Sequence, residues 1–361
     1  MGRTIVQGIS TDTLNDVRII YAGSLAPGTN AYGRSRAFKR LGAEVLSFDF
    51  DLFGANNKFK KSWDYYTQFS LAQRCLNKKF IQNVIAFQPD LVWVDKGLSL
   101  YPGSIETARV GSKKTRFVHY NPDDPFGSFS KGRGLLAWRT FIKAISVYDF
   151  HFVARQENIE EFLEHGATRV ETFDRSFDPM RHRPIELDAK DRAKYSTNVG
   201  FIGSYARDRS KSITSLIKAG IDVSVIGSGW KNTPDWKTIE PHWRGPSIYG
   251  DEYAKAICGM KICLHFLRRE NRDDQDSRTF EIPACGSFML AERSDSHERL
   301  FEDKKEAIYF DNDSDLRQKV EYFLLNDEER KAIAAAGYTR CLTSGYDHES
   351  RLKELLTQIL P

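Results

Sequence analysis

The stretch VRIIYAGSLAPGTNAYGRSRAFKRLGAEVLSFD, residues 17–49, contains a strand, a turn, a helix and a second strand in direct succession. The β-branched run at residues 17–22 predicts the first strand, and residues 23–30 are rich in turn formers. Residues 31–41 follow as a helix, and residues 44–49 are the next strand. Two strands joined through a helix form a βαβ unit with parallel strands, so this opening predicts an α/β fold.

The same alternation continues along the chain. A long helix is predicted at residues 69–87, and strands at 89–95, 115–120 and 150–154. A second series begins with a strand at residues 198–203. It continues with strands at 222–227, 261–266, 287–290 and 307–310, and with helices at 210–219, 250–259, 279–284, 313–325, 327–336 and 348–360. Strands that alternate with helices at this spacing predict parallel sheets covered on both faces.

The length of 361 residues exceeds that of a typical single core, so two domains are expected. Residues 173–197 are polar, carry two prolines and lack a sustained period, which is typical of a linker. The sequence therefore predicts an N-terminal Rossmann-like domain at residues 1–172 and a C-terminal one at 198–345. Residues 346–361 are predicted as a helix that can cross back to the first domain. Ligands of such sheets bind beyond the carboxyl ends of the strands.

The composition is that of a soluble globular protein, with 40% hydrophobic and 28% charged residues. No run of apolar residues is long enough to predict a membrane-spanning helix. The N-terminal stretch MGRTIVQGISTDTLND lacks the apolar segment and the cleavage site of a signal peptide, so a cytoplasmic location is expected. The five cysteines are scattered and none forms a C-x-x-C pair, which argues against disulfides and structural zinc.

The net charge of +4 is distributed unevenly. Residues 1–195 carry 29 Lys and Arg against 22 Asp and Glu, whereas the remainder carries 24 against 27. The basic half is interpreted either as an ordinary solvated surface or as a contact for an anionic acceptor or an acidic membrane. Peripheral association with the inner membrane face therefore stays open. No basic stripe alternates with aromatic residues, so nucleic-acid binding is not expected.

Two loops of the N-terminal half are candidate functional segments. Gly28, Thr29 and Asn30 precede a helix, where a close backbone approach and free amides suit a phosphate, although a plain turn explains them equally. The loop HYNPDDPF, residues 119–126, offers His119, Asp123 and Asp124 as catalytic candidates that activate or orient a sugar hydroxyl. The alternatives for the two aspartates are a divalent cation site or stabilisation of the turn.

Two strand ends of the C-terminal half are candidate donor-binding segments. Gly203 and Ser204 end one strand, and Arg207 and Arg209 lie on the turn into the next helix, where backbone donors and a guanidinium suit a diphosphate. Of the two, Arg207 is the candidate donor ligand. The next strand ends in Gly227, Ser228, Gly229 and Trp230. Trp230 is interpreted either as a platform for a nucleoside or as a residue that caps the core.

The most informative segment is FLRRENRDDQDSRTFEIPACG, residues 266–286. A charged loop leads into a short helix with Ser277 as the predicted N-cap, and the helix start presents amides to a phosphate. Glu281 lies one turn into this helix, where a carboxylate can accept hydrogen bonds from both ribose hydroxyls. The alternative is an ordinary capped helix with a solvated glutamate.

This segment, with MLAE at residues 289–292, resembles the C-terminal domain of the CgeB-like glycosyltransferases. They belong to the group-1 glycosyltransferases of the GT-B architecture, in which two Rossmann-like domains face each other across a donor and acceptor cleft. The likeness covers about residues 198–350, and the 119–126 loop resembles the equivalent family loop. It implies that Glu281 holds the donor ribose. It also implies a donor-binding set that includes Arg268, Asn271, Asp273, Ser277, Arg278 and Thr279.

The same resemblance bears on chemistry. Asp273 stands where the family usually has a second glutamate, eight residues before Glu281, and Asn271, Asp274 or Asp276 can substitute for it. Group-1 enzymes generally need no metal, so neither a metal nor a cofactor is expected. Arg207, Arg268 and Arg278 are expected to stabilise the departing diphosphate.

The predicted function is thus transfer of a hexose from a nucleoside diphosphate sugar, UDP-linked, to a hydroxyl acceptor in cell-surface or secondary glycan synthesis. The acceptor can be a glycan, a lipid-linked molecule or a small molecule. Two other functions stay open: a nucleotide-sugar 2-epimerase, and a sugar-nucleotide-binding module without catalysis.

Overall fold

The computed structural model describes residues 14–53, 64–128 and 133–360. The chain divides into two compact units. The first comprises Met1–Asp174, Glu270–Arg272 and His348–Pro361, and the second Arg175–Arg269 and Asp273–Asp347. The N-terminal stretch without signal-peptide features lies, up to residue 13, outside the described residues.

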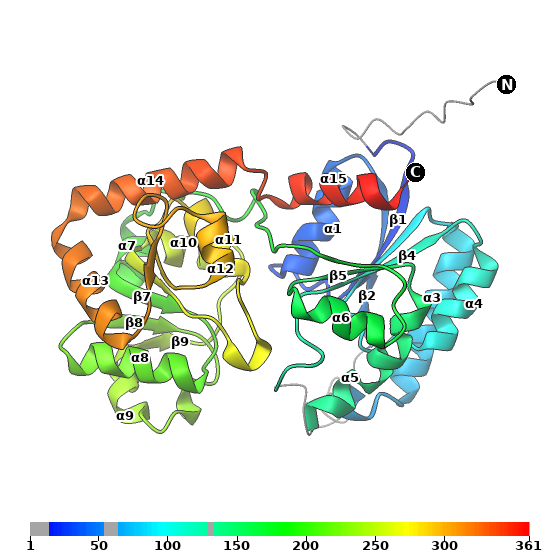
Figure 1. Ribbon diagram of the computed structural model, residues 1–361, viewed down its shortest axis with the longest axis horizontal. Coiled ribbons are helices and arrows are strands. Elements are labelled where there is room, and N and C mark those ends of the chain that lie inside the picture. Colours follow the sequence, from blue (N-terminus) through cyan, green and yellow to red (C-terminus); the bar gives the residue numbers. More distant parts are fainter. Residues whose placement is uncertain (1–13, 54–63, 129–132, 361) are drawn as a thin grey trace. The chain divides into compact units, whose positions relative to one another are not determined.

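The first unit contains a six-stranded parallel sheet in the order β2-β1-β3-β4-β5-β6 (Figure 1). Its strands are β1 (Arg18–Gly23), β2 (Glu44–Asp49), β3 (Leu91–Asp95), β4 (Arg116–Asn121), β5 (Phe150–Val153) and β6 (Val170–Thr172). Its helices are α1 (Asn30–Arg40), η1 (Phe50–Phe53), α3 (Leu71–Phe87), α4 (Pro102–Gly111), α5 (Arg133–Ala144), η3 (Ile145–Val147), α6 (Glu157–Glu164) and α15 (His348–Ile359). All five residues of β3 are buried, as expected for a strand covered on both faces.

The second unit contains another six-stranded parallel sheet, in the order β12-β11-β10-β7-β8-β9. Its strands are β7 (Thr197–Ile202), β8 (Val223–Ile226), β9 (Trp243–Gly245), β10 (Met260–His265), β11 (Met289–Glu292) and β12 (Ile308–Phe310). Its longer helices are α7 (Ala189–Tyr195), α8 (Arg207–Lys218), α10 (Asp251–Cys258), α11 (Ser277–Ala284), α12 (Asp295–Leu300), α13 (Asp313–Leu325) and α14 (Asp327–Thr343). Its short turns of helix are η4 (Trp230–Asn232), α9 (Trp236–Ile239), η5 (Glu240–His242) and η6 (Arg269–Asn271), the last of which runs into the first unit.

The predicted α/β class with two parallel sheets is confirmed. The sequence missed β6 and β9, which lie at sheet edges and have three residues each. Such short strands carry too few alternating residues to produce a recognisable pattern. It also missed α4, which begins at Pro102 and has no side-chain hydrogen bond at its N-cap.

The segment predicted as a linker belongs largely to the second unit. From Arg175 onward the chain is part of that unit, and α7 lies within the segment. Phe177 is buried in the same core cluster as Phe280 and Tyr346. The polar composition of residues 173–197 hid these contacts, because single apolar anchors between polar residues show no period.

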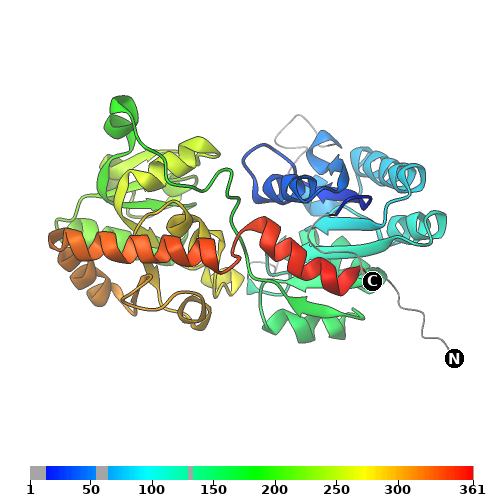
Figure 2. The ribbon, with the colours of Figure 1, turned by 90° about the horizontal axis from the view of Figure 1, so that it is seen from above.

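The C-terminal helix α15 belongs to the first unit. Its buried face, formed by Leu352, Leu355, Leu356 and Ile359, joins the core cluster that contains Phe38 of α1. Figure 2 shows α15 in red beside α1 in blue, and the two helices are in contact. Burial of four aliphatic side chains contributes about 1.5–3 kcal/mol each, which explains why the chain end returns to this unit.

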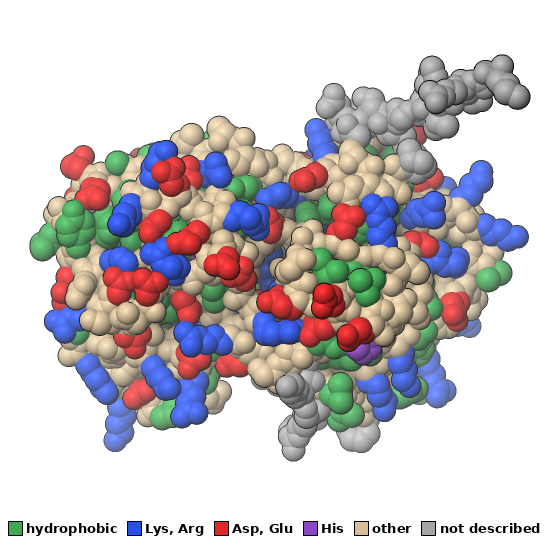
Figure 3. Space-filling view, viewed as in Figure 1, with side chains coloured by type: hydrophobic (Ala, Val, Ile, Leu, Met, Phe, Trp, Pro, Cys, Tyr) green, Lys and Arg blue, Asp and Glu red, His purple; other side chains and the backbone are tan. Residues whose placement is uncertain are grey.

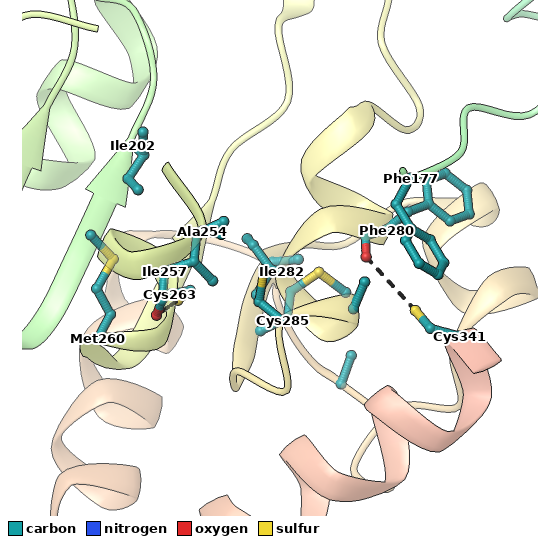
Figure 4. Close-up of a cluster of buried hydrophobic side chains, with 14 of the residues drawn as sticks. Phe177, Ile202, Ala254, Ile257, Met260, Cys263, Phe280, Ile282, Cys285 and Cys341 are labelled. Atoms are coloured by element: carbon teal, nitrogen blue, oxygen red, sulfur yellow. Dashed lines mark hydrogen bonds between the residues drawn. The ribbon is translucent and has the colours of Figure 1, made fainter. Parts of the chain in front are cut away.

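One core of the second unit surrounds α11. Phe280, Ile282, Ala284 and Cys285 of the segment at residues 277–286 are all buried there (Figure 4). The thiol of Cys341, on α14, donates to the carbonyl oxygen of Phe280 at 3.7 Å. The segment is therefore anchored on its apolar side, which positions its polar side chains.

Acidic and basic side chains are interspersed over the face in Figure 3. Over the described ranges, no helix has the length and apolar character needed to cross a bilayer.

Candidate functional site

The turn after β7 depends on two glycines that touch. Gly227, at the end of β8, has a φ of +156°, and a Cβ there would lie 1.9 Å from the carbonyl oxygen of Gly203. The same carbonyl accepts a hydrogen bond of 2.9 Å from Nε1 of Trp230. Gly229, with a φ of +83°, is the N-cap of η4 and starts the turn that holds Trp230. The glycines thus serve close packing of two strand ends.

Trp230 is a core residue. Its side chain is 1% exposed and packs edge-on against Phe201 and Tyr205. The interpretation of Trp230 as an open platform for a nucleoside does not match this position, because neither ring face is accessible. Its indole N–H instead holds the Gly203 turn in place.

The guanidinium groups of the buried Arg209 and the half-buried Arg278 meet at the carboxyl end of β7. Arg209 of α8 donates to the carbonyl oxygens of Ser204 at 3.0 Å and Phe266 at 3.3 Å. Arg278 of α11 donates to the carbonyl oxygen of Ile202 at 3.1 Å. Both groups lie over the ring of Phe201, at 5.4 and 5.8 Å from its centroid. Two helices of the unit thus bring positive charge to the sheet edge where α/β proteins bind ligands.

This edge has an excess of positive charge. Burial, followed by the charge of Arg278, lowers the pKa of Arg209 to about 10. Arg268 adds a further repulsion, and Asp276 and Asp273 offset part of it. Within the part of the chain that the structure describes, the Nε atoms of Arg209 and Arg278 are buried without a hydrogen-bond acceptor. A buried guanidinium in this state gains from an anion that accepts its remaining N–H groups.

Of the two arginines that the sequence places after Ser204, the structure buries Arg209 and not the candidate ligand Arg207. Arg207 is the first residue of α8 and is exposed, and Ser204 is exposed as well. The helix beginning at residue 207 directs Arg209 inward. A signal existed in the chain, because Arg209 precedes Ser210 and Ile213, which are on the buried face of α8.

The start of α11 differs from the prediction. Asp276, not Ser277, is the N-cap: its side chain accepts from the amide of Arg278 at 2.7 Å. The amide of Asp276 in turn donates to Oγ1 of Thr279, which completes a capping box. The carboxylate of Asp276 therefore accepts from the amide of Arg278, which was expected to donate to a phosphate. The guanidinium groups of Arg209 and Arg278 are thus the better anion ligands here. Asp276 also forms an ion pair with the guanidinium of Arg278.

Glu281 lies one turn into α11 and is 5% exposed. Tyr253 of α10 donates to its Oε2 at 2.6 Å, and Nε2 of His182 lies 3.8 Å from its Oε1. His182 comes from the segment predicted as linker and is itself 2% exposed. Glu281 is thus held in one orientation by a hydroxyl on one oxygen and an imidazole near the other, contacts that the sequence did not reveal.

Thr279 is held from behind by His297. Nε2 of His297 lies 2.9 Å from Oγ1 of Thr279, and its Nδ1 lies 2.7 Å from the carbonyl oxygen of Glu292. These partners suit a neutral imidazole that donates from Nδ1 and accepts at Nε2. Burial, followed by the nearby His265, lowers the pKa of His297 to about 3.

This histidine makes the second unit sensitive to acid. Because the folded pKa lies below the unfolded value of about 6.5, the unfolded state binds the extra proton first. The stability that His297 contributes is complete above pH 6.5 and falls by up to about 1.4 kcal/mol per pH unit as the pH drops toward 3. Denaturant unfolding between pH 7 and 4 should show a shallower loss for His297→Asn than for the wild type. The exposed His165→Gln is the control, and an identical slope for His297→Asn would contradict the assignment.

Two other predicted donor residues have structural partners. Asp273 has a side chain only 2% exposed, and its Oδ1 lies 3.7 Å from Nη2 of Arg175. Asn271 belongs to the first unit, where its Oδ1 accepts from the amide of Asp124 at 3.0 Å. Arg268 is partly buried, and its carbonyl oxygen accepts from the amide of Asp273 at 3.1 Å. Asn271 therefore contacts the 119–126 loop, which the linear sequence did not indicate.

Asp124 is the centre of a buried charge network in the first unit. It is 1% exposed, and its Oδ1 accepts from the amide of Phe126 and from Nδ2 of Asn158, both at 3.0 Å. Arg272 donates to both carboxylate oxygens, at 2.5 and 2.9 Å, and also to Glu161. Burial acts to raise the pKa of Asp124, but the hydrogen bonds from Arg272 and Asn158 outweigh it and lower the pKa below its usual value.

Arg272 reaches this network in a strained conformation. Its φ of +45° lies in the left-handed region, which a long side chain rarely occupies. Its carbonyl oxygen accepts from Nε of Arg155 at 3.2 Å. Such strain persists only where surrounding contacts outweigh it. The hydrogen bonds from Arg272 to Asp124 and Glu161 are the contacts that outweigh this strain.

The other catalytic candidates of this loop occupy different environments. His119 is fully buried within β4, and its Nδ1 lies 3.0 Å from Nδ1 of His151. Burial, followed by the neighbouring His151, lowers the pKa of His119 well below its ordinary value. Asp123 is partly exposed and forms an ion pair of 2.5 Å with Lys96. His119 is thus a core residue rather than a loop residue that faces a ligand.

The two adjacent aspartates point to different cations, Lys96 and Arg272. Across residues 14–53, 64–128 and 133–360, no three His, Cys, Asp or Glu side chains converge as ligands of one metal ion would.

The Gly28 loop is a βα turn. Gly28 has a φ of +94°, and Thr29 is the N-cap of α1, accepting from the amide of Tyr32 at 3.2 Å. The hydroxyl of Thr29 donates to the carbonyl oxygen of Ala26 at 2.9 Å. These contacts account for Gly28 and Thr29 without a ligand, and Asn30 is the first residue of α1.

Known proteins resemble this chain in part of its sequence and in its fold. Residues 209–357 match a family model described as glycosyl transferase-like. The spore protein CgeB of Bacillus subtilis is 24% identical over 174 residues, which are 44% of this chain and 53% of that protein. The chain thus spans about half the length of this curated relative.

Solved structures match nearly the whole chain. The sucrose-phosphate synthase of Thermosynechococcus elongatus has a TM-score of 0.66 and 11% identity, covering 95% of this chain and 98% of that one. HepE of Anabaena, in complex with UDP and glucose, has a TM-score of 0.63 and 14% identity, covering 95% and 100%. The α,α-trehalose 6-phosphate synthase of Burkholderia multivorans has a TM-score of 0.61 and 11% identity, covering 96% and 98%. Residues 209–357 of this chain are therefore similar to a glycosyl transferase-like family, and the chain has the GT-B fold.

Proposed function

We propose that this protein is a glycosyltransferase that moves a sugar from a UDP-linked donor to a hydroxyl acceptor. The observation that carries the proposal is the pairing of the buried Arg209 and the half-buried Arg278 with the oriented carboxylate of Glu281 at one sheet edge. A nucleoside diphosphate has a dianionic group and a pair of ribose hydroxyls that match these two features. The glycosyl transferase-like domain at residues 209–357 and the solved complex of HepE with UDP support the choice of donor.

The arginines would act on the leaving group. When the bond between the sugar and the diphosphate breaks, negative charge grows on the bridging phosphate oxygen. Guanidinium groups that are already fixed by carbonyl contacts can stabilise this charge without reorganising. Arg278 has its position set by the carbonyl oxygen of Ile202 and by Asp276, so it is pre-organised for this role.

For the acceptor hydroxyl we retain Asp123 as the contact. It is the partly exposed member of the three catalytic candidates, whereas Asp124 and His119 are buried with partners in the first unit. Asp124 is a weak base in this setting, because its ion pair with Arg272 stabilises the charged form.

Membrane contact from the cytoplasmic side remains part of the proposal for a lipid-linked acceptor. It is supported by the basic charge of residues 1–195 and by α5, which exposes Leu135 and Leu136 in the same helix as Arg139 and Lys143. Apolar side chains flanked by basic ones suit the interface of an anionic bilayer.

The donor assignment is tested by thermal shift with a panel of nucleotide sugars and UDP. A ligand that binds the folded state at 100 times its Kd adds about 2.7 kcal/mol of stability. UDP and its best sugar conjugate should therefore raise the Tm of the wild type, and Glu281→Ala should lose this shift because the ribose loses its acceptor.

The exposed Glu321→Ala on α13 is the matched control and should keep the full shift. An undiminished shift in Glu281→Ala would refute the ribose assignment. Product analysis then separates the reactions: free UDP formed with an acceptor indicates transfer, whereas a new sugar nucleotide indicates epimerisation. Binding without either product indicates a module without catalysis.

A further inference from the structure

Two cysteines meet at the C-terminal ends of α10 and α11 in the second unit. Cys258 is the last residue of α10, and Cys285 is the C-cap of α11. Sγ of Cys258 lies 3.5 Å from the carbonyl oxygen of Cys285, and each of the two thiols shifts the pKa of the other. Cys258 is partly exposed and Cys285 is buried. The sulfur of Cys258 is therefore accessible to a small reagent, and Cys285 is its buried neighbour.

The surroundings of Cys258 favour its thiolate. The amide of Ile185 donates to its Sγ at 3.4 Å, and Arg183 adds a nearby positive charge. The neighbouring Cys285 thiol has the largest influence, and together these neighbours lower the pKa of Cys258 to about 7. At neutral pH a large fraction of this sulfur is thus in the nucleophilic form.

The buried cysteines of the same core lack this combination. Cys263 and Cys341 are buried, and burial raises the pKa of each thiol above its ordinary value. Cys341 donates to the carbonyl oxygen of Phe280 (Figure 4). Reactivity should therefore concentrate at Cys258.

We propose that Cys258 is a modification site for hydroperoxides, and that Cys285 converts the oxidised Cys258 into a disulfide. In the first step the Cys258 thiolate attacks a peroxide oxygen, so an S–O bond forms while the O–O bond breaks and hydroxide leaves. In the second step the Cys285 sulfur attacks the sulfenic sulfur, forming the S–S bond. The S–O bond breaks, and the hydroxyl leaves as water with the proton of Cys285. Two thiols are oxidised by two electrons, and one peroxide is reduced.

The disulfide would act on the donor site, a consequence that rests on the proposed function. α10 carries Tyr253 and α11 carries Glu281, which are joined by the 2.6 Å hydrogen bond. The segment that contains Ile185 also contains His182, whose Nε2 lies 3.8 Å from Glu281. Joining the helix ends removes the thiolate that accepts from Ile185. We expect this change to disturb the orientation of Glu281 and to weaken UDP binding about tenfold, the effect of one hydrogen bond.

The modification is tested on the folded, full-length protein with hydrogen peroxide as the oxidant. After treatment, free thiols are alkylated in denaturant and the protein is analysed by peptide mapping. We expect a Cys258–Cys285 cross-linked peptide that lacks two hydrogens and disappears on reduction. Cys285→Ser should stop at the sulfenic acid and react with dimedone at Cys258. Cys258→Ser should form no cross-link.

Cys75→Ser is the matched control, because Cys75 is exposed and lies in the first unit. It should behave as the wild type does. Oxidation confined to Cys75 in the wild type, or a cross-link between other cysteines, would overturn the proposal even if a variant failed to fold.

UDP affinity of the oxidised and reduced forms tests the coupling to Glu281. A tenfold loss that reduction restores supports it, and equal affinities overturn it. A reduced protein that does not bind UDP would overturn the proposed function, and with it this consequence. The peptide map would still decide whether the disulfide forms.

Discussion

Replacing Arg209 with methionine is expected to lower the affinity for UDP about 100-fold. Hydrogen bonds between a charged donor and a phosphate contribute about 1.5–3 kcal/mol each, and Arg209 would supply such a bond from a buried position. Methionine keeps an unbranched chain of similar length and fills the same space. Isothermal titration calorimetry with UDP measures the loss.

The design includes two matched controls. Arg207→Met lies two residues away on the same helix and is exposed, so it should change the affinity less than about threefold, as screened surface charges do. Uridine, which lacks the diphosphate, should bind the wild type and Arg209→Met equally. An equal loss for UDP and uridine, or a larger loss in Arg207→Met, would show that Arg209 does not contact the diphosphate.

Replacing Asp124 with alanine is expected to destabilise the first unit by about 3 kcal/mol. The change leaves the guanidinium of Arg272 with one of its two carboxylates and removes the acceptor of Asn158 and of the Phe126 amide. Breaking a buried pair from one side costs about 3–5 kcal/mol, and the partial exposure of Arg272 reduces this value. Scanning calorimetry should show a lower transition temperature. Because the protein has two units, it can unfold in two transitions, and the shift can then be confined to one of them.

Asp123→Ala is the control on the adjacent residue. Its ion pair with Lys96 is partly solvated, so its loss should cost less than about 1 kcal/mol. The double variant Asp124→Ala with Arg272→Leu should lose less stability than the two single variants lose together. The double variant has no guanidinium that could be left without its Asp124 partner. If Asp124→Ala kept its stability and lost only turnover, Asp124 would be a catalytic base rather than a structural ion-pair partner.

Several parts of the candidate site could be predicted from local sequence patterns. Glu281 follows a charged loop in a short helix, and its position near the start of that helix depends only on nearby residues. The glycines at positions 203 and 227 mark strand ends because only glycine tolerates such close packing. These features rest on contacts between residues close in sequence or on a steric rule for one residue type.

Other parts depend on contacts that cross the chain. Asn271 and Asp124 are 147 residues apart, and His182 comes from the segment predicted as a linker whereas Glu281 comes from the predicted C-terminal domain. Without these partners, the sequence could not separate buried residues from those that face a ligand. For the same reason the sequence favours Arg207 over Arg209 as a ligand, although Arg207 is exposed and Arg209 is buried.

For this protein, the sequence by itself determined the βαβ opening at residues 17–49, the two parallel α/β sheets and the place of the 277–286 segment at a helix start. Local periodicity and turn chemistry encode these features, so they are readable before folding. Only the tertiary structure decided that Trp230 and His119 are core residues, that Asp276 caps α11 and that Arg209 and Arg278 lie over the same ring, that of Phe201. Burial and electrostatics are properties of neighbours in space, and those neighbours are brought together by the sheets.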